Sequence, residues 1–269
     1  MLVNKNKFSF TRLTFYSTYG LWLLLFVIAP LMLLLWQSLV GSDGHLTLQN
    51  YQTFFVSGTY LTMAFNSVWY AFIITAVTLL ISYPAAYIIN SLKYKQFWLL
   101  LIILPTWINL LLKTYAFIGI LAKTGPINQL AESLGLGTHQ LLFSDWSFII
   151  VAAYIEIPFM ILPIFNSLTD IDPVLEQASR DLGANRWQTL KNVIWPLSLP
   201  GVKSGIQAVF IPSLSLFMVT RLIGGNRVIT LGTAIEQHFL VTQNWQFGST
   251  IGVVLIIAMV ITMLLTREK

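Results

Sequence analysis

The sequence predicts an all-α integral membrane protein with about six transmembrane helices. Of its 269 residues, 56% are hydrophobic and only 9% are charged, and the mean hydropathy is +0.75. These values lie well outside the range of soluble globular domains. The apolar residues also form runs of roughly 20, the length that a helix needs to cross a bilayer. Because the runs are continuously apolar and do not alternate with polar residues, they favour helices over a barrel.

Six runs are long enough to span a membrane, and we expect them to belong to one domain, 1–269. They cover residues 19–39, 61–92, 97–121, 148–168, 202–223 and 247–266. The first is longer than the apolar region of a signal peptide and no small-residue cleavage site follows it, so we expect it to remain in the mature chain. The second exceeds one bilayer thickness, which predicts a tilted or extended helix. Gly201 and Gly205, at the start of the fifth, are spaced to let another helix approach closely.

The basic residues orient these spans, because loops rich in Lys and Arg stay in the cytoplasm. Four of the fifteen lie on the opposite side of a six-span topology: Lys113, Lys123, Arg221 and Arg227. The other eleven share one side: Lys5, Lys7, Arg12, Lys93, Lys95, Arg180, Arg186, Lys191, Lys203, Arg267 and Lys269. We therefore expect a multi-pass protein of the plasma (inner) membrane, in contact with lipid, with both termini cytoplasmic. No basic stripe gathers on one soluble element, so the net charge of +5 does not indicate a nucleic-acid partner.

The sequence offers no catalytic, cofactor or metal site of its own. The phosphate-binding pattern G-x-x-x-x-G-K-[ST] is absent, so the chain is not expected to hydrolyse ATP. The three histidines, His45, His139 and His238, lie far apart without metal-ligand spacing, and no nucleophile elbow occurs. There are no cysteines, which excludes disulfides and thiolate chemistry.

A charged segment, about residues 170–201, interrupts the apolar pattern between the fourth and fifth spans. Asp172 before Pro173 predicts the start of a helix, and Gly183 supplies the permissive backbone with which that helix ends. Asn185 and Gln188 are spaced as a capping box for a second helix, which we expect Pro196 to end. The result is a cytoplasmic helix-turn-helix, and on these features alone a plain connecting loop remains the alternative.

The same segment resembles the cytoplasmic coupling loop in permease subunits of ABC importers. The residues that carry the E-A-A, then G, then I-x-L-P pattern are Glu176, Ala178, Gly183, Ile194 and Pro196. The sequence departs from the pattern at Gln177 and at Trp195, where the closing hydrophobic residues are shifted. The stretches YPAAY (83–87), PTWINLLLKTYAFIGIL (105–121), IPFMILP (157–163) and LIGG (222–225) are similar to the spermidine/putrescine branch over most of the chain.

This resemblance implies an ATP-driven permease for polyamines that is not an enzyme by itself. It implies three kinds of partner: an ATPase dimer that binds ATP and Mg²⁺, a second homologous permease subunit, and an extracytoplasmic substrate-binding protein. Glu176 and Ala178 would lie on the helix that docks on the ATPase, and Gly183 would turn the chain back towards Pro196 and the membrane. Other small solutes, such as oxyanions, thiamine or iron chelates, are the alternative cargo.

Glu156 is the first candidate for the substrate pathway, because a carboxylate within an apolar span costs on the order of 2–3 kcal/mol or more and usually faces a cavity. Trp107, Tyr115 and Tyr154 are candidates for cation–π contact with an ammonium group, although aromatic residues are also enriched at membrane interfaces. Arg221 is an alternative, permanent partner for Glu156, and together with Lys113 it would suit an anionic cargo better.

Two other classes of protein stay open from the residues alone. A channel or secondary transporter would explain a charge within the membrane but gives no reason for the coupling loop. A membrane-embedded enzyme would need converging catalytic groups, which the sequence does not offer. Co-purification with an ATPase separates these three readings.

Overall fold

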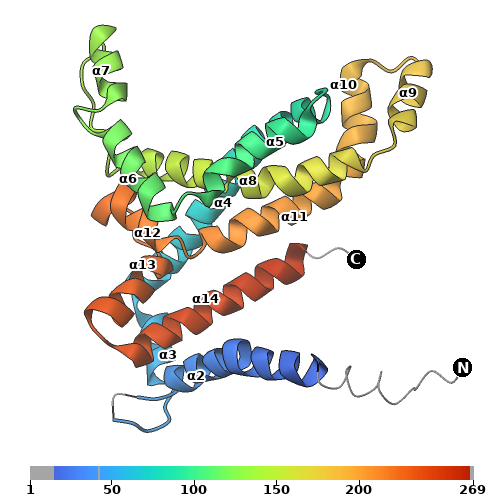
Figure 1. Ribbon diagram of the computed structural model, residues 1–269. Coiled ribbons are helices and arrows are strands. Elements are labelled where there is room, and N and C mark those ends of the chain that lie inside the picture. The colour runs from blue at the N-terminus through green and yellow to red at the C-terminus, as the bar shows by residue number, and fades with distance from the viewer. Residues whose placement is uncertain (1–14, 42, 267–269) are drawn as a thin grey trace, which may run out of the picture. The chain divides into compact units, whose positions relative to one another are not determined.

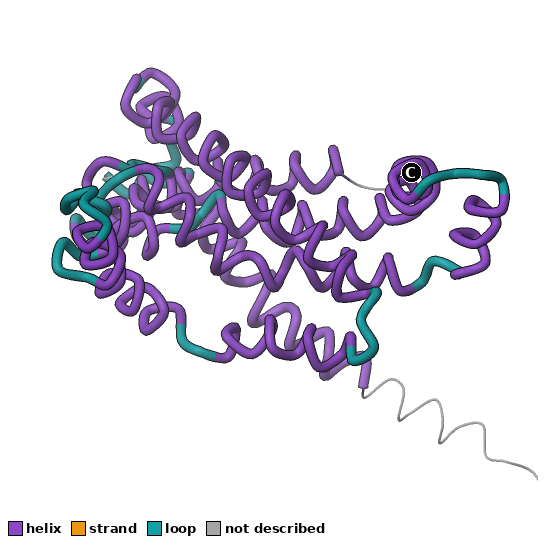
Figure 2. Tube along the Cα trace, turned by 90° about the horizontal axis from the view of Figure 1, so that it is seen from above, coloured by secondary structure: helices purple, strands orange, loops and turns teal. Residues whose placement is uncertain are grey.

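The computed structural model describes residues 15–41 and 43–266, and within these it is built of helices and loops without an extended strand (Figures 1 and 2). The all-helical prediction is therefore confirmed. Five of the basic residues used to orient the chain, Lys5, Lys7, Arg12, Arg267 and Lys269, lie outside the described residues. The chain divides into two compact units, residues 1–58 with 235–254 and residues 59–234 with 255–269.

The first unit is built around the N-terminal span. The span runs over Phe15–Ser38 and includes the π-helical turn η1 (Leu24–Ile28) and α2 (Ala29–Ser38), followed by α3 (Gln49–Val56). Apart from Ser38, no residue of this span is buried, as expected for a helix that faces lipid or a partner. Ser38 fixes its end, since its hydroxyl shares a hydrogen bond with the Tyr51 hydroxyl at 2.7 Å and its carbonyl accepts one from Thr250 at 3.2 Å.

The second unit holds the remaining spans, and α13 and α14 contribute residues to both units. Its helices are α4 (Gly58–Asn90), α5 (Lys95–Ile103), α6 (Leu110–Leu121), α7 (Pro126–Ser133), α8 (Asp145–Thr169), α9 (Pro173–Asp181), α10 (Arg186–Thr189), α11 (Trp195–Ser213), α12 (Phe217–Val219), α13 (Leu231–Glu236) and α14 (Trp245–Thr266). The shorter turns of this unit are η2 (Leu104–Trp107), η3 (Leu190–Ile194), η4 (Thr220–Gly224) and η5 (Gly225–Arg227), whereas η6 (Gln237–Val241) belongs to the first unit.

The core of the second unit lies along α8, the most buried of its helices. Val151, Met160 and Ile164 are fully buried there, and α11 packs alongside α8. The predicted close approach at Gly201 and Gly205 is confirmed. A Cβ atom at Gly201 would lie 2.5 Å from the Pro163 carbonyl oxygen of α8. Because α7 precedes α8 and α9 follows it, these two short helices lie at opposite ends of α8 (Figure 1).

The prediction of one continuous third span over 97–121 is wrong. α5 gives way to the 3₁₀ turn η2, Ile108 is extended with ψ 134°, and α6 begins only at Leu110. The break has two local causes. Pro105 has no N–H and its ring disfavours continuation of the α5 helix, whereas the Asn109 side chain starts a new helix by accepting a hydrogen bond from the Leu111 N–H at 2.8 Å.

The fifth predicted span is bent. Its two parts, Arg186–Ser213 and Phe217–Gly224, meet at 56°, just after Pro212 in the last turn of α11. The described part of the chain therefore contains five helices long and apolar enough to cross a membrane, or six if this bent pair is one span. That range agrees with the predicted number of about six.

Candidate functional site

The coupling loop, residues 170–201, folds as a helix-turn-helix as the sequence predicts. The Asp172 carboxylate caps α9 by accepting a hydrogen bond from the Val174 N–H at 2.9 Å. Glu176 forms an ion pair with Arg180 one turn further along, so this carboxylate also supports α9 itself. Ala178 lies exposed on the same helix.

The turn between the two helices depends on Gly183. Its φ is +86°, in the left-handed region that side chains with a Cβ disfavour, and its N–H donates to the Arg180 carbonyl at 2.9 Å. The next helix starts with the predicted capping box, in which the N–H of Asn185 donates to the Gln188 side chain at 2.8 Å and the N–H of Gln188 donates back to Asn185 at 2.9 Å. The predicted start of the first helix, the turn at Gly183 and the capping box of the second helix are confirmed.

Large apolar side chains project from this helix-turn-helix. Leu182 is 90% exposed and Trp187 is 69% exposed, and Val174 and Leu175 of α9 are exposed as well. Trp187 is thus exposed, whereas Ile194 further along the same helical run is buried. A group of exposed apolar residues on an otherwise charged segment is typical of a surface that contacts a partner.

The prediction that Pro196 ends the second helix is wrong. The helix passes from α10 through the π-helical turn η3 into α11, with Pro196 in the first turn of α11. In η3 the Trp195 N–H donates to the carbonyl of Leu190, five residues back. This wider turn makes room where a proline ring would otherwise meet the preceding carbonyl. The coupling loop is thus continuous with the fifth span, and the Tyr83 hydroxyl of α4 shares a hydrogen bond with Ser198 at 2.9 Å.

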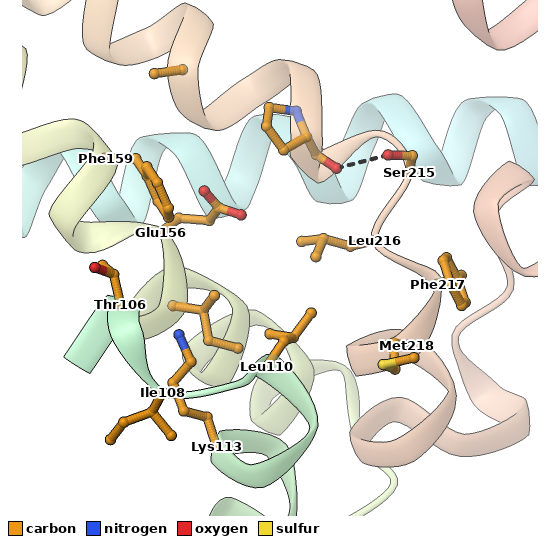
Figure 3. A pocket seen from close by; sticks show the side chains of 13 residues that line it. Thr106, Ile108, Leu110, Lys113, Glu156, Phe159, Ser215, Leu216, Phe217 and Met218 are labelled. Atoms are coloured by element: carbon orange, nitrogen blue, oxygen red, sulfur yellow. Dashed lines mark hydrogen bonds between the residues drawn. The ribbon is translucent and has the colours of Figure 1, made fainter. Parts of the chain in front are cut away.

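A cavity of about 490 Å³ lies where the break in the third span and the bend in the fifth span face the continuous fourth span (Figure 3). It is bordered by the η2–α6 break, by α8, and by the segment around the bend after α11. The residues that line it are Thr106, Ile108, Leu110, Lys113, Ile155, Glu156, Phe159, Ala208, Pro212, Ser215, Leu216, Phe217 and Met218. Most of this lining is apolar, so the few polar groups in it decide what it can bind.

Glu156 and Lys113 supply the two charges of this cavity. Glu156 is only 4% exposed, and its side chain makes no hydrogen bond with any other described residue. Figure 3 shows its carboxylate pointing into the cavity from α8 and the Lys113 ammonium entering from α6. The two side chains line the same cavity without forming a contact ion pair. A buried carboxylate with so little local support is a strong candidate to bind a mobile cation.

The predicted aromatic residues do not gather around Glu156. Tyr154 lines a second, adjoining cavity of about 190 Å³ and packs edge-on against Phe117, with ring centroids 5.0 Å apart. Trp107 is 79% exposed and Tyr115 is 57% exposed, and neither lines either cavity. Arg221, the alternative partner of Glu156, is also exposed and outside both linings, and its pairing with Glu156 stays a prediction.

Sequence reasoning did not identify the polar and aromatic residues that complete the cavity, namely Thr106, Phe159, Ser215 and Phe217. Two signals were available. Phe159 follows Glu156 by three positions on one helix and so shares its face, and Pro212 marks the bend that brings the next residues into the lining. Neither signal indicates by itself that the broken third span, α8 and the bent fifth span meet at one cavity.

Comparison with known proteins supports the importer resemblance. Residues 51–267 match the family described as "Binding-protein-dependent transport system inner membrane component". The spermidine/putrescine transport system permease protein PotB of Haemophilus influenzae is 34% identical over 248 residues, covering 88% of this chain and 86% of that protein. PotB of Escherichia coli (strain K12) is 33% identical over 248 residues, covering 88% and 90%.

The fold also matches a solved transporter. A chain in the crystal structure of a bacterial alginate ABC transporter, in complex with alginate pentasaccharide-bound periplasmic protein, aligns with a TM-score of 0.81 at 17% identity. The alignment covers 97% of this chain and 93% of that chain. At this identity the likeness establishes the fold alone.

Proposed function

Because this chain belongs to the family of binding-protein-dependent transport system inner membrane components, we propose that it is the permease subunit of an ATP-driven importer that carries polyamines such as spermidine or putrescine into the cytoplasm. Its relatives carry those substrates in their names. The observation that carries the proposal within this chain is the buried, cavity-facing carboxylate of Glu156.

The chemistry of the cavity suits an alkyl ammonium substrate. An ionised carboxylate taken out of water needs a partner, because burial without one costs several kcal/mol. A polyamine supplies that partner as a protonated amine, and its methylene groups match the apolar remainder of the lining. Glu156 would hold one ammonium group while Phe159 and Leu216 contact the methylene groups of the polyamine. Lys113 argues for an anionic group instead, which keeps other small solutes as the alternative cargo.

The energy source lies outside this chain. In this proposal the exposed apolar residues around Leu182 and Trp187 dock on a separate ATPase, with Glu176 and Ala178 on the docking helix. ATP and Mg²⁺ bind in that partner, whose dimer moves the coupling loop. A second homologous permease subunit completes the pathway, and an extracytoplasmic binding protein delivers substrate. Both termini and the coupling loop face the cytoplasm, in keeping with the side on which most Lys and Arg residues gather.

The test is the substitution Glu156→Gln, which keeps the shape of the side chain and removes its charge. We expect the assembled transporter, reconstituted with its ATPase and binding protein, to lose most of its initial spermidine uptake while the yield of complex stays near that of the parent. Glu132→Gln, on the exposed face of α7, is the matched control. Parental uptake by assembled Glu156→Gln complex would exclude the pathway role.

The same substitution separates substrate binding from a structural pair with Arg221. A structural pair predicts that Glu156→Gln lowers assembly itself and that adding Arg221→Gln restores part of it. A substrate-binding carboxylate predicts normal assembly for Glu156→Gln and no such recovery. Complex yield and uptake are measured for both single variants and for the double variant.

A further inference from the structure

Lys113 borders two adjoining cavities of the second unit. The cavity of about 490 Å³ that contains Glu156 and the cavity of about 190 Å³ that contains Tyr154 share three lining residues, Thr106, Lys113 and Ile155. Lys113 is the only one of the three with a long, flexible and charged side chain. Its ammonium therefore has two spaces within reach.

The position of Lys113 follows from the break in the third span. The Asn109 cap starts α6, which places Lys113 in the first turn and next to the opening between η2 and α8. The Lys113 side chain makes no hydrogen bond or contact ion pair with another described residue, and Glu156 is the acidic residue that lines the same cavity. A lysine held so loosely beside a buried carboxylate is not organised as a structural ion pair, which would need close geometry and further hydrogen bonds.

We propose that Lys113 is a tethered counter-ion, which neutralises Glu156 in the empty transporter and is displaced when a substrate ammonium arrives. This inference rests on the proposed function. The lysine ammonium is the same chemical group as the end of a polyamine, so the two compete for one carboxylate. On displacement Lys113 turns towards the second cavity, where the Tyr154 ring offers a face for a cation. Its return towards Glu156 then favours release of the substrate.

This role makes a prediction of definite sign. If Lys113 competes with substrate, removing its charge strengthens substrate binding and slows release. If Lys113 instead binds an anionic end of the substrate, removing its charge weakens binding. The second case would fit a zwitterion, with its ammonium on Glu156 and its carboxylate on Lys113. The Michaelis constant therefore distinguishes a counter-ion from a ligand-binding residue.

The experiment measures initial uptake of spermidine and putrescine by the complete reconstituted transporter, normalised to assembled complex. For Lys113→Met we expect KM to fall by about three- to tenfold, the scale of one partly screened charge interaction, and kcat to fall with it because release slows. Lys113→Arg keeps the charge and should return KM towards the parental value. Lys113→Gln provides the same measurement if the Met variant assembles poorly.

An unchanged or raised KM in both neutral variants would overturn the counter-ion role. Inhibition of uptake by 4-aminobutyrate that is lost in Lys113→Met would show instead that Lys113 binds the carboxylate of a zwitterion. In the Glu156→Gln background Lys113→Met should cause no further fall in KM, because the carboxylate for which Lys113 and the substrate compete is no longer there. Failure of the proposed function gives a different result, namely parental uptake by Glu156→Gln. The two failures are therefore distinguishable.

Discussion

Gly201 offers the sharpest test of how the fifth span is held. In Gly201→Ala the new Cβ would lie 2.5 Å from both the Pro163 carbonyl oxygen and the Ser167 Cβ of α8, against 3.4–4 Å for an ordinary contact. Both neighbours are atoms that cannot turn away. The helices must therefore separate by roughly 1 Å, and overpacking of this kind costs typically about 1–3 kcal/mol.

Two other glycines supply an internal scale for this prediction. At Gly205 the nearest atom to a new Cβ is the Met160 sulfur at 2.7 Å, and a methionine side chain can adjust. At Gly119, inside α6, no atom lies within 4 Å, so Ala there removes only the helix penalty of glycine, about 0.5–1 kcal/mol. We expect stability to fall in the order Gly119→Ala, Gly205→Ala, Gly201→Ala.

The assay is the thermal denaturation of each purified variant in one detergent. A loss of about 2 kcal/mol lowers Tm by roughly 4–8 °C in a domain of this order of size, which is readily resolved. Gly119→Ala should denature at or above the parental temperature. A Tm for Gly201→Ala equal to that of Gly119→Ala would show that α8 and α11 are not packed as closely as described.

Two further predictions concern the coupling loop. Gly183→Val places a β-branched residue at a φ of +86°, a strain of about 1–2 kcal/mol, and should abolish substrate-stimulated ATP hydrolysis, whereas Gly183→Asn, which tolerates this backbone, should retain most of it. Parental stimulation in the Val variant would refute the coupling role. Because the chain has no native cysteine, single substitutions report topology. Asn185→Cys should react with an impermeant reagent only after the cytoplasmic face is opened, and Gly58→Cys should react in intact cells. The reverse pattern would overturn the orientation.

The sequence predicts the parts of the fold that local chemistry decides. Apolar runs that cross a bilayer must form helices, because the backbone N–H and C=O groups have no water to bind there. The caps at Asp172 and Asn185 and the turn at Gly183 depend on side chains or backbone freedom within three residues. Each of these features is encoded by neighbours in the chain. For that reason the all-helical class and the helix-turn-helix of the coupling loop follow from the sequence and agree with the structure.

The incorrect predictions concern prolines, whose effect depends on the geometry of the preceding turn. Pro105 interrupts the third span, but Pro196 lies inside a helix because the π-helical turn before it makes room for the ring. Composition does not distinguish these cases. The cavity shows the same limit, since Lys113 and Glu156 come from helices whose contact is settled by packing. The sequence shows each of them as a charged residue within an apolar span, but it does not show that the two line one cavity.

The correction at Pro196 bears directly on mechanism. Because the helix does not end there, one helical run extends from Arg186 to Ser213, about 40 Å at roughly 1.5 Å per residue. It starts at the coupling loop, packs against α8 through Gly201, and ends where Pro212 lines the cavity. If the proposed function holds, a displacement of the coupling loop would be carried to the cavity wall by a packed helix. On this basis Gly201→Ala should separate α8 from α11 and uncouple ATP hydrolysis from uptake together, whereas Gly183→Val should uncouple them through strain at the turn while the packing of α8 and α11 is preserved.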